Sequence, residues 1–316
     1  MSVLITGGMG FIGLHTARAF VDAGEDCVIT YYQTWREPSF IKDEYGKHVI
    51  VEKADVSDPN VVKQLAAKHK VDSILHLAVP GVAALSAVED YHVNMDGLIG
   101  VLEASRELGV RRLSIASSVA VYASLGDGPL REDALLPVTS GNPTETFKKA
   151  WEVLGTHYAD RTKLDVAFLR IAGIWGPLYH SMMNLPSRLA HAAVKNAEPD
   201  FSPGKGGVPF AEDAQDLCYV KDTAQGIRIV HQAPTLEHRV YNIGQGAPTS
   251  VGQLVAAVKK VKPSAKLEVN PGKGPRNKKN NYMDISRAAA LGYKPAFTPE
   301  AAIADYIAWL EAGNEK

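Results

Sequence analysis

The chain has 316 residues, of which 46% are hydrophobic and 22% are charged, and its formal net charge is -1. This is the composition of an ordinary globular protein, and the length allows one large domain or two small ones. Without an excess of basic residues, the chain lacks the positive field that attracts nucleic acid or an anionic membrane. Its longest apolar runs are also far shorter than the ~20 residues of a membrane-spanning helix. We therefore expect neither nucleic acid nor a membrane as a partner.

The start of the chain and its cysteines bear on where the protein works. The chain goes straight into Val3-Leu4-Ile5, which is typical of a buried strand, so we expect no signal peptide. Cys27 and Cys218 are too few for a disulfide framework and too far apart in sequence for a zinc knuckle. We therefore expect free thiols, no metal site and a cytoplasmic location.

Short β-rich runs alternate with amphipathic stretches through the first half of the chain. The predicted strands cover residues 3–5, 27–30, 48–51, 73–77, 112–116 and 166–171. The predicted helices cover residues 12–23, 60–69, 88–108 and 144–158. Gly24 and Gly109 are expected to close the first and third of these helices. Nearly continuous apolar strands that alternate with helices are typical of an α/β fold whose parallel sheet is covered on both faces.

A glycine-rich turn lies between the first predicted strand and the first predicted helix. Gly7, Gly10 and Gly13 form the pattern G-x-x-G-x-x-G, with Gly8 as an additional glycine. The first glycine permits a tight turn, the second lets the backbone approach a pyrophosphate, and the third lets the helix pack closely on the sheet. The phosphates would then face N–H groups at a helix N-terminus. Because it directly follows an apolar strand, the pattern predicts a Rossmann-type doubly wound sheet that binds a dinucleotide.

The strand–helix rhythm breaks after Gly173. Residues 173–214 are rich in Pro and Gly, whereas residues 217–220 and 240–243 look like strands that return to the sheet. The remainder is predicted to contain a helix at 251–261, a basic loop at 273–279 and a helix at 299–312. We expect a dinucleotide-binding domain of residues 1–172 and about 215–246, and a smaller discontinuous substrate lobe of residues 173–214 and 247–316. A ligand would lie in the crevice at the carboxyl ends of the strands.

An ordered series of motifs makes the chain resemble a known family. The series is Thr6-Gly7-Gly8-Met9-Gly10-Phe11-Ile12-Gly13, Ala54-Asp55-Val56, His76-Leu77-Ala78, Asn94, Ala116-Ser117-Ser118-Val119-Ala120-Val121-Tyr122, Leu169-Arg170, Gly176-Pro177, Tyr241-Asn242-Ile243-Gly244, Asp284-Ile285-Ser286-Arg287-Ala288 and Leu291-Gly292-Tyr293. On these residues, and over essentially its whole length, the chain resembles the extended short-chain dehydrogenase/reductase family, the NAD-dependent epimerase/dehydratase group. The resemblance implies NAD or NADP as cofactor.

The resemblance also implies which residues contact the cofactor. Asp55 and Val56 would contact the adenine, and Ala78 would contact the ribose and phosphates. The same Asp55 is equally well explained as a turn residue at a strand end. The full expected set is Gly7, Gly10, Phe11, Ile12, Gly13, Tyr31, Arg36, Asp55, Val56, Leu77, Ala78 and Lys148.

The end of the second predicted strand bears on the choice between NAD and NADP. A fold that prefers NAD usually has Asp or Glu there, ~20 residues beyond the glycines, to bind the ribose 2′-OH. Here the strand runs into Tyr31-Tyr32, so a 2′-phosphate would meet no carboxylate at this position. Arg36 or Lys42 could approach that phosphate, although Arg36 is also explained as a solvated loop charge. We predict that NADP is tolerated and that NAD is not excluded.

The set of catalytic residues that the family uses is incomplete in this chain. Family members combine a Ser or Thr with a Tyr that acts as general acid or base, and a Lys four residues later lowers the pKa of the phenol. Ser118 matches the serine and Lys148 the lysine, but Thr144 stands where the tyrosine is expected. A threonine hydroxyl is too weak an acid, and its side chain too short, to replace a phenol. Shifting the register to Lys149 places Glu145 at that position, which does not restore it.

Other residues could take over the role of the missing tyrosine. Thr144 could hold a water that relays the proton, or Glu145 could act as the base, although Glu145 is also placed to pair with Lys148. A purely structural explanation is that Asn142 caps the helix, Pro143 takes its first position and Glu145 closes a capping box. Further candidates from elsewhere in the crevice are Tyr122, Tyr179 and His180.

Substrate contacts are expected from Ser118 and from the C-terminal lobe. Tyr179, His180 and Asn184 lie in a segment that resembles the family's substrate-facing loop. Arg276 is positioned like the arginine that contacts the diphosphate in nucleotide-sugar members, and a guanidinium suits that contact. Arg276 is also explained as part of a solvated basic loop.

The leading interpretation is an NAD(P)-dependent oxidoreductase or epimerase that acts on a hydroxyl or carbonyl of a sugar, polyol or related small molecule, with a non-standard acid/base. Sugar 4,6-dehydration is disfavoured, because Ser118-Val119-Ala120 lacks the Thr-Asp-Glu run of the family's dehydratases. The alternative is a dinucleotide-binding sensor or regulatory protein that has lost catalysis. The resemblance also implies a homodimer in which the helices near residues 89–108 and 144–158 pack as a four-helix bundle.

Overall fold

The computed structural model describes residues 2–79, 85–203, 207–275 and 277–314, in two units that each combine several segments of the chain. The first unit comprises Met1–Ser124, Leu136–Arg170 and Ile227–Tyr241. The second unit comprises Leu125–Leu135, Ile171–Gly226 and Asn242–Lys316. Residues 125–135, which we expected in the dinucleotide-binding domain, thus lie in the second unit. Their backbone explains this, since Leu130 N–H donates to Tyr282 O and Leu130 O accepts from Asp284 N–H.

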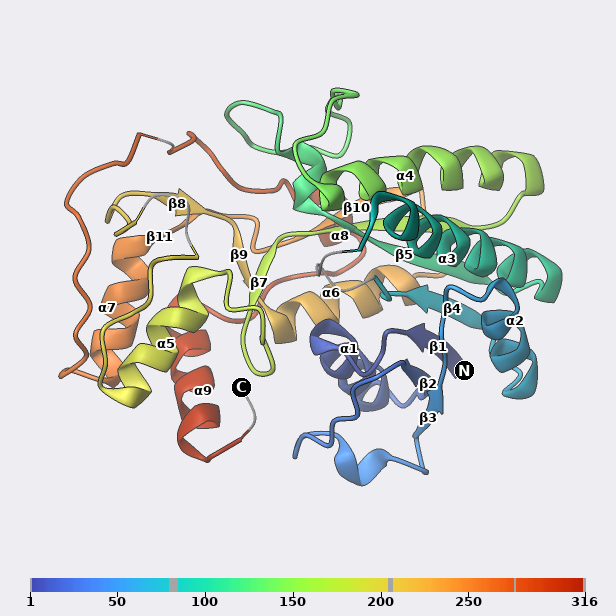
Figure 1. Cartoon of the computed structure of the whole chain (residues 1–316), viewed down its shortest axis with the longest axis horizontal. Coiled ribbons are helices and arrows are strands. Elements are labelled where there is room, and N and C mark those ends of the chain that lie inside the picture. The colour runs from blue at the N-terminus through green and yellow to red at the C-terminus, as the bar shows by residue number, and fades with distance from the viewer. Residues whose placement is uncertain (1, 80–84, 204–206, 276, 315–316) are drawn as a thin grey trace. The chain divides into compact units, whose positions relative to one another are not determined.

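Seven strands form the central sheet, in the spatial order β10-β6-β5-β4-β1-β2-β3 (Figure 1). They are β1 (Ser2–Thr6), β2 (Asp26–Tyr31), β3 (Val49–Lys53), β4 (Ser73–His76), β5 (Arg112–Ser118), β6 (Val166–Ile171) and β10 (Val240–Ile243). The pairings of β1 with β2 and β4, of β2 with β3 and of β4 with β5 are parallel. The predicted doubly wound α/β sheet is confirmed. The chain places β2 and β3 on one side of β1 and then β4 on the other, so the topological switch point lies at the carboxyl ends of β1 and β4.

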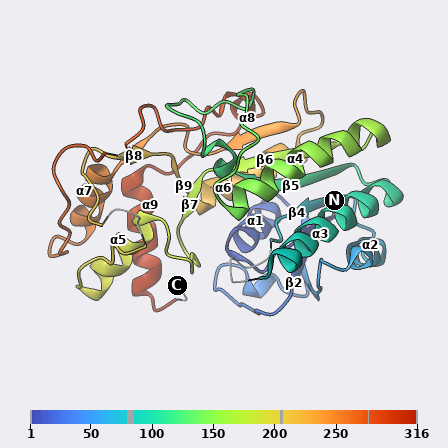
Figure 2. The same ribbon diagram turned by 45° about the horizontal axis from the view of Figure 1, so that its top comes forward.

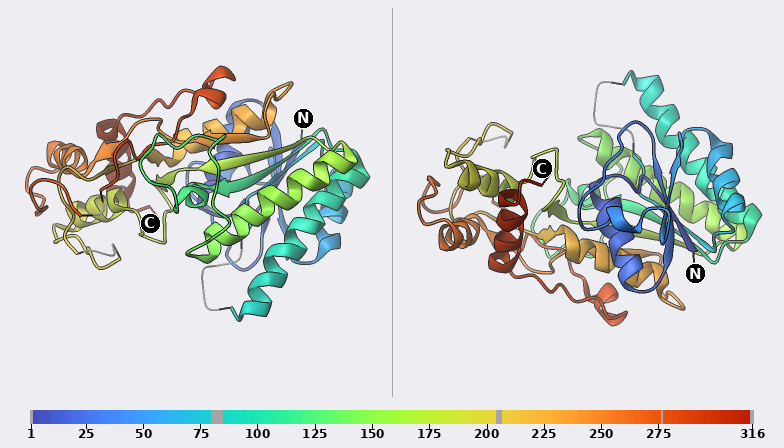
Figure 3. Two further views of the ribbon diagram at one scale, coloured as in Figure 1. Left: turned by 90° about the horizontal axis from the view of Figure 1, so that it is seen from above. Right: turned by 90° about the horizontal axis from the view of Figure 1, so that it is seen from below.

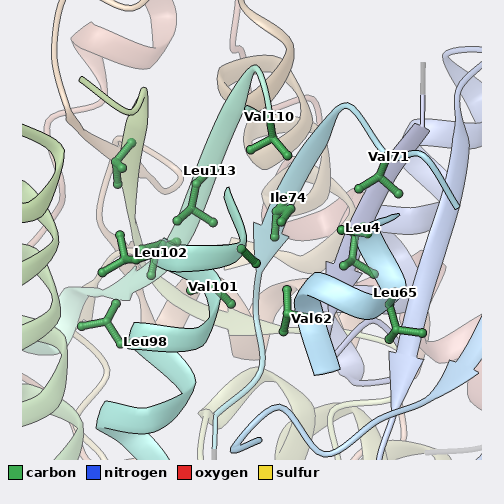
Figure 4. Packing of buried hydrophobic residues seen from close by; sticks show 14 of the residues in the cluster. Leu4, Val62, Leu65, Val71, Ile74, Leu98, Val101, Leu102, Val110 and Leu113 are labelled. Atoms are coloured by element: carbon green, nitrogen blue, oxygen red, sulfur yellow. The ribbon is translucent and has the colours of Figure 1, made fainter. Parts of the chain in front are cut away.

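Helices cover both faces of the sheet in the first unit. They include α1 (Phe11–Asp22), α2 (Pro59–Lys68), α3 (Ala87–Leu108) and α4 (Pro143–Thr162). α2 and α3 pack on one face, where aliphatic side chains interlock (Figure 4), among them Leu4, Val62, Leu65, Ile74, Leu98, Val101, Leu102 and Leu113. On the same side, α3 and α4 run next to each other (Figures 2 and 3). On the other face, the ring of Phe20 in α1 meets that of His231 edge-on at 5.7 Å between centroids.

Local sequence signals fix the ends of α3. Ser86 Oγ accepts from the Glu89 N–H, and the Glu89 carboxylate accepts from the Ser86 N–H, which completes a capping box. At the other end, Gly109 has a φ of 60°, a left-handed conformation that suits glycine. The predicted end of this helix is therefore confirmed.

Two short sheets and several helices make up the second unit. β7 (Gly173–Trp175) pairs with β9 (Leu217–Tyr219), and β8 (Ala214–Gln215) pairs with β11 (Thr249–Ser250). The helices α5 (Leu185–Lys195), α7 (Val251–Val261) and α9 (Pro299–Glu311) pack around a second hydrophobic core (Figure 1). The remaining helical elements of the chain are α6 (Val220–Gln232), α8 (Ser286–Ala290), η1 (Lys42–Glu44) and η2 (Val119–Tyr122).

The prediction that residues 217–220 return to the central sheet is wrong. β9 pairs with β7 instead, and the next residue, Val220, already begins α6. The edge position next to β6 is taken by β10, whose strand was predicted with its observed bounds. The sequence reading also missed α5 inside a segment that looked irregular because of its Pro and Gly content. Among the described residues, no helix has the length and apolar character needed to cross a membrane.

Candidate active site

The glycine-rich turn joins β1 to α1 at the switch point of the sheet. Gly7 has a φ of 67°, and a Cβ there would lie 2.8 Å from the Ala78 Cα. A Cβ on Gly13 would lie 2.5 Å from Gly7 O, and one on Gly8 would lie 2.5 Å from a side-chain atom of β2. Backbone atoms therefore pack at distances that only glycine allows, and Gly10, the N-cap residue of α1, provides no side-chain cap. This leaves the helix N-terminus available to an anion, as a pyrophosphate cradle requires.

The loop after β2 folds back onto this turn. Thr30 holds the turn through two bonds, because its Oγ1 accepts from Gly7 N–H at 2.9 Å and its carbonyl accepts from Met9 N–H at 3.1 Å. Arg36 Nη1 donates to the Met9 carbonyl at 3.2 Å, which places the guanidinium beside the turn. Tyr31, the last residue of β2, packs edge-on against Trp35 with their ring centroids 5.2 Å apart. The end of β2 thus offers a cation close to the glycine-rich turn.

The structure places the other expected cofactor residues at the ends of β3 and β4. Leu77 N–H donates to Thr6 O at 3.1 Å, and Ala78 abuts the position where Gly7 would carry a Cβ. Asp55 is exposed, and its Oδ1 accepts from both the N–H and the hydroxyl of Ser57. The carboxylate therefore shapes the turn after β3, which is the structural role that the sequence also allowed. Val56 is half-buried against the core of the first unit.

Lys148 is buried on α4, with its amine in an unusual setting. Its Nζ lies 3.8 Å from the centroid of the Trp151 ring and makes no hydrogen bond with the described residues. Burial lowers the pKa of Lys148 to about 7, although the charge of Glu152 acts in the opposite direction. Burial also lowers the pKa of His76 to about 3, helped by the charge of Lys148. His76 is therefore neutral at pH 7, and its Nδ1 lies 2.7 Å from the Thr6 hydroxyl oxygen. A buried amine with unused hydrogen-bonding capacity fits a site that a polar ligand completes.

A buried polar network connects the strand that carries Ser118 to the helix that carries Lys148. Glu152, one helical turn after Lys148, accepts from the Ser117 hydroxyl at 2.5 Å and from Arg170 Nε and Nη2 at 3.0 and 2.7 Å. Arg170 Nη1 in turn donates to the Tyr122 hydroxyl oxygen at 2.7 Å. The network ties together β5, η2, α4 and β6, all within the first unit. It fixes the backbone on which Ser118 and Lys148 stand.

Ser118 is half-buried at the end of β5. Its Oγ accepts from Ala120 N–H at 3.1 Å and so caps η2. Because a hydroxyl can donate while it accepts, this cap leaves the Ser118 proton free to bind a substrate oxygen.

The first turn of α4 shows why neither Thr144 nor Glu145 can take the role of the family's tyrosine. Thr144 is exposed. Glu145 is 1% exposed, and its carboxylate accepts from Gly141 N–H at 3.0 Å, Lys149 Nζ at 2.7 Å and the Ser124 hydroxyl at 2.9 Å. The bond from Gly141 and the pair with Lys149 lower the pKa of Glu145 to about 2. Its carboxylate is too weak a base to take a proton from an alcohol.

Two details of this turn correct the sequence interpretation. Glu145 pairs with Lys149, four residues later, rather than with Lys148. Asn142 does cap the helix, since its Oδ1 accepts from Glu145 N–H at 2.9 Å, and Pro143 does begin it. The expected capping box is wrong, because the Glu145 carboxylate reaches Gly141 N–H, one residue before the cap. Residues three and four apart both share a helix face, so the spacing alone allowed Glu145 to contact either lysine.

The remaining candidates lie in the second unit. Tyr179 is buried, whereas the neighbouring His180 is exposed. Asn184 precedes α5, and its Nδ2 donates to Ile174 O at 2.6 Å, so it holds β7. Arg276 lies outside the described residues.

A cavity of about 580 Å³ lies within the second unit. Its walls are mostly apolar, from residues such as Phe201, Val208 and Leu254. Polar groups enter it from Arg188, Asp213, Gln215, Asn277, Lys278 and Asn281. Pro275 and Asn277, the neighbours of Arg276 in sequence, also line it. An apolar cavity with a few polar groups is the usual form of a small-molecule site.

Fold and site together define a dinucleotide-binding α/β protein whose first unit carries a glycine-rich turn, a half-buried serine and a buried lysine. The sequence profile described as "NAD dependent epimerase/dehydratase family" matches residues 3–244. The chain therefore belongs to this family of enzymes. The family assigns it a nicotinamide dinucleotide, and the glycine cradle and the unsatisfied Lys148 amine fit that cofactor.

Individual relatives are distant in sequence but cover most of the chain. The chain is 24% identical over 315 residues to the low-salt glycan biosynthesis protein Agl12 of Haloferax volcanii, covering 95% of each chain. It is 27% identical over 286 residues to a UDP-glucose 4-epimerase of Bacillus subtilis, covering 83% of this chain and 82% of the relative. Similar solved structures include the UDP-glucose 4-epimerase of Thermotoga maritima with UDP-glucose and the UDP-glucuronic acid 4-epimerase of Bacillus cereus with NAD. Each has a TM-score of 0.79 at 19% identity and covers 99% of both chains, so the fold is shared.

The sequence reading did not recognise how the site is supported. From the sequence, Arg170 was predicted only as part of a motif. A charged residue in the middle of an apolar strand nevertheless indicates a buried partner. The sequence reading assigned no role to Trp151, because nothing in the spacing shows that a lysine three residues earlier lies over its ring. Thr30 was also missed, although a hydroxyl next to a glycine-rich turn is a natural acceptor for its N–H groups.

Proposed function

We propose that this chain is an NAD(P)-dependent oxidoreductase or epimerase that acts on a hydroxyl or carbonyl group of a sugar, polyol or related small molecule, with an acid/base other than the family's tyrosine. The observation that carries the proposal is that Ser118 and Lys148 are retained although the tyrosine is absent. Ser118 and Lys148 stand on elements joined by the buried Glu152–Arg170 pair, whereas Thr144 is exposed. A protein that only senses a dinucleotide has no need of Ser118.

The chain's own residues would divide the work as follows. The turn at Gly7, Gly10 and Gly13 would hold the pyrophosphate, and Lys148 would donate to the nicotinamide ribose. The Ser118 hydroxyl would orient the reacting oxygen of the substrate. When bound, the nicotinamide supplies hydride transfer to or from carbon.

The named relatives suggest which substrates to test first. Several are UDP-glucose or UDP-glucuronate 4-epimerases, so we propose nucleoside diphosphate sugars as the leading substrate class. The cavity in the second unit, apolar with a few polar groups, is proposed to bind a small molecule. Arg276 is proposed to contact the diphosphate, and Tyr179, His180 and Asn184 are proposed to contribute to substrate binding.

The loop after β2 supports tolerance of NADP. Arg36 is anchored beside the glycine-rich turn, and β2 ends in Tyr31 rather than in an acid that would repel a 2′-phosphate. Fluorescence titration with NADH and NADPH should give dissociation constants within about tenfold of each other, which corresponds to ~1.4 kcal/mol. In the Arg36→Ala variant only the NADPH affinity should fall. Strong exclusion of NADPH by the wild-type protein would rule out this part of the proposal.

Exposed apolar residues on the long helices support a homodimer. Val88, Tyr91 and Ile99 of α3 and Val153 and Leu154 of α4 are exposed, and the two helices lie side by side (Figure 2). We propose that this face pairs with its copy in a four-helix bundle, because pairing would remove these exposed apolar side chains from water.

The function is tested by incubating the protein with NAD⁺ or NADP⁺ and a panel of UDP-sugars, free sugars and polyols. Nicotinamide absorbance detects net oxidation, and chromatography of the products detects epimerisation, which leaves the cofactor unchanged overall. Formation of an oxidised or epimerised product supports the proposal. Tight dinucleotide binding without any product from the panel would favour a sensor instead.

A further inference from the structure

The missing tyrosine leaves open which group moves the proton in the proposed reaction. Within the first unit, the structure removes three candidates. The Thr144 hydroxyl is exposed, and an aliphatic hydroxyl ionises far above neutral pH. The Glu145 carboxylate is committed to Gly141, Lys149 and Ser124. The Tyr122 hydroxyl is buried and accepts from Arg170.

Lys148 is different from all of these groups. Its Nζ is buried, makes no hydrogen bond with the described residues and is not neutralised by a contacting carboxylate. The nearest acid on its own helix, Glu152, is occupied by Arg170 and the Ser117 hydroxyl. The amine therefore keeps all of its hydrogen-bonding capacity for a ligand, on the same helix face where the family relies on a charged lysine.

We propose that Lys148 is itself the proton donor and acceptor of this enzyme, in place of the absent phenol. The inference rests on the proposed function and adds the residue that carries the proton. In the oxidation direction, the lone pair of the neutral amine forms an N–H bond as the substrate's O–H bond breaks. The hydrogen on the same carbon leaves with its electron pair for the oxidised nicotinamide, and the C–O bond becomes a carbonyl. In the reverse direction, the ammonium returns the proton to the oxygen.

The charges around Lys148 allow both of its protonation states near neutral pH. Burial disfavours the ammonium and brings the pKa to about 7, while Glu152 on α4 favours it. The face of the Trp151 ring, 3.8 Å from Nζ, also favours a cation. From β4, His76 is neutral, and from β6, Arg170 is neutralised by Glu152. Further along α4, Lys149 and Glu145 neutralise each other. A group poised between its two forms is suited to acid–base catalysis.

The first test uses the protein without cofactor or substrate. Lysine labelled with ¹³C at Cε reports protonation through its chemical shift, and the Lys148→Arg spectrum identifies the Lys148 signal by its loss. We expect one lysine signal that titrates near pH 7. A Lys148 signal that stays in the ammonium form above pH 9 would overturn the proposal.

The second test separates proton transfer from cofactor binding. Arginine keeps the positive charge and the donors but does not release its proton, so Lys148→Arg should bind the dinucleotide within about fivefold of wild type. Its turnover should fall by ~10²–10⁴-fold, the range of general acid–base catalysis. If Lys148→Arg does not fold, Lys148→Met takes its place as the test, because methionine keeps the apolar stem. It should show the same loss of turnover. Lys149→Arg is the matched control and should retain wild-type turnover.

The outcomes distinguish this inference from the proposed function. If wild type turns over a substrate and Lys148→Arg does so at a similar rate, Lys148 is not the proton carrier, but the function stands. If wild type forms no product from any substrate, the function itself fails and this inference fails with it. Loss of turnover in Lys148→Arg with retained dinucleotide binding, together with a Lys148 signal that titrates near pH 7, supports it.

Discussion

Replacing Arg170 by methionine should destabilise the protein strongly. Arg170 and Glu152 form a buried ion pair in which the side chains are 4% and 9% exposed. The pair makes two hydrogen bonds, at 3.0 and 2.7 Å, and Arg170 makes a third with Tyr122 at 2.7 Å. Methionine fills most of the volume but leaves the Glu152 carboxylate buried without its cation.

The size of this destabilisation depends on whether one or both partners of the buried ion pair are removed. Removing one partner of a buried ion pair costs about 3–5 kcal/mol, because the other charge stays buried and uncompensated. Replacing both partners by apolar residues costs much less, since no charge is then left in the interior. The double variant Arg170→Met/Glu152→Leu should therefore lose only about 1–3 kcal/mol, which reflects the orphaned hydroxyls of Ser117 and Tyr122.

Urea unfolding at pH 7, followed by circular dichroism, measures these differences. Arg131→Met is the control, since Arg131 forms exposed pairs with Asp133 and Asp284 and its loss should leave the unfolding curve unchanged. An Arg170→Met variant within about 1 kcal/mol of wild type would contradict the reasoning. So would a double variant that is as unstable as the single one.

Three further predictions address other parts of the molecule. Gly13→Ala should weaken NADH binding at least tenfold in fluorescence titrations, because its Cβ would lie 2.5 Å from Gly7 O. The control Gly126→Ala should leave NADH binding unchanged, because its Cβ meets no atom within 4 Å and Gly126 does not have a positive φ. Burial raises the pKa of Asp216 to about 6, so its contribution to stability is present below pH 4 and lost as the pH rises through 6. The unfolding free energy of wild type relative to Asp216→Asn should therefore fall by about 2 kcal/mol between pH 4 and 6.5, and a flat difference would show that the carboxyl is not buried as described. Ile99→Glu should convert the proposed dimer to monomers in light scattering, an expectation that a monomeric wild-type protein would rule out.

Much of the first unit is determined by local sequence signals. The alternation of apolar strands and amphipathic helices has one common solution, a parallel sheet with helices on both faces. The glycine pattern after β1 is equally local, since it reflects backbone distances that a Cβ would violate at Gly7 and Gly13. Motif order along the chain then identified the family, which the profile match to residues 3–244 confirms.

Only the tertiary structure decided which strand residues 217–219 join and which lysine Glu145 contacts. Residues 217–219 read as a strand, but which strand they join depends on the edge that β10 already fills. Helix spacing allowed Glu145 to reach either lysine, and only the packed turn shows Lys149 as its partner.

The nicotinamide dinucleotide could thus be predicted from the sequence alone, because its cradle is one short segment in which each residue's role follows from its neighbours. The setting of Lys148 could not be predicted in this way. Its amine is buried over the Trp151 ring, and Glu152, one helical turn later, is paired with Arg170 on β6. Burial and charge are sums over groups that are distant in sequence, so only the folded chain shows that this amine is buried and makes no hydrogen bond with the described residues.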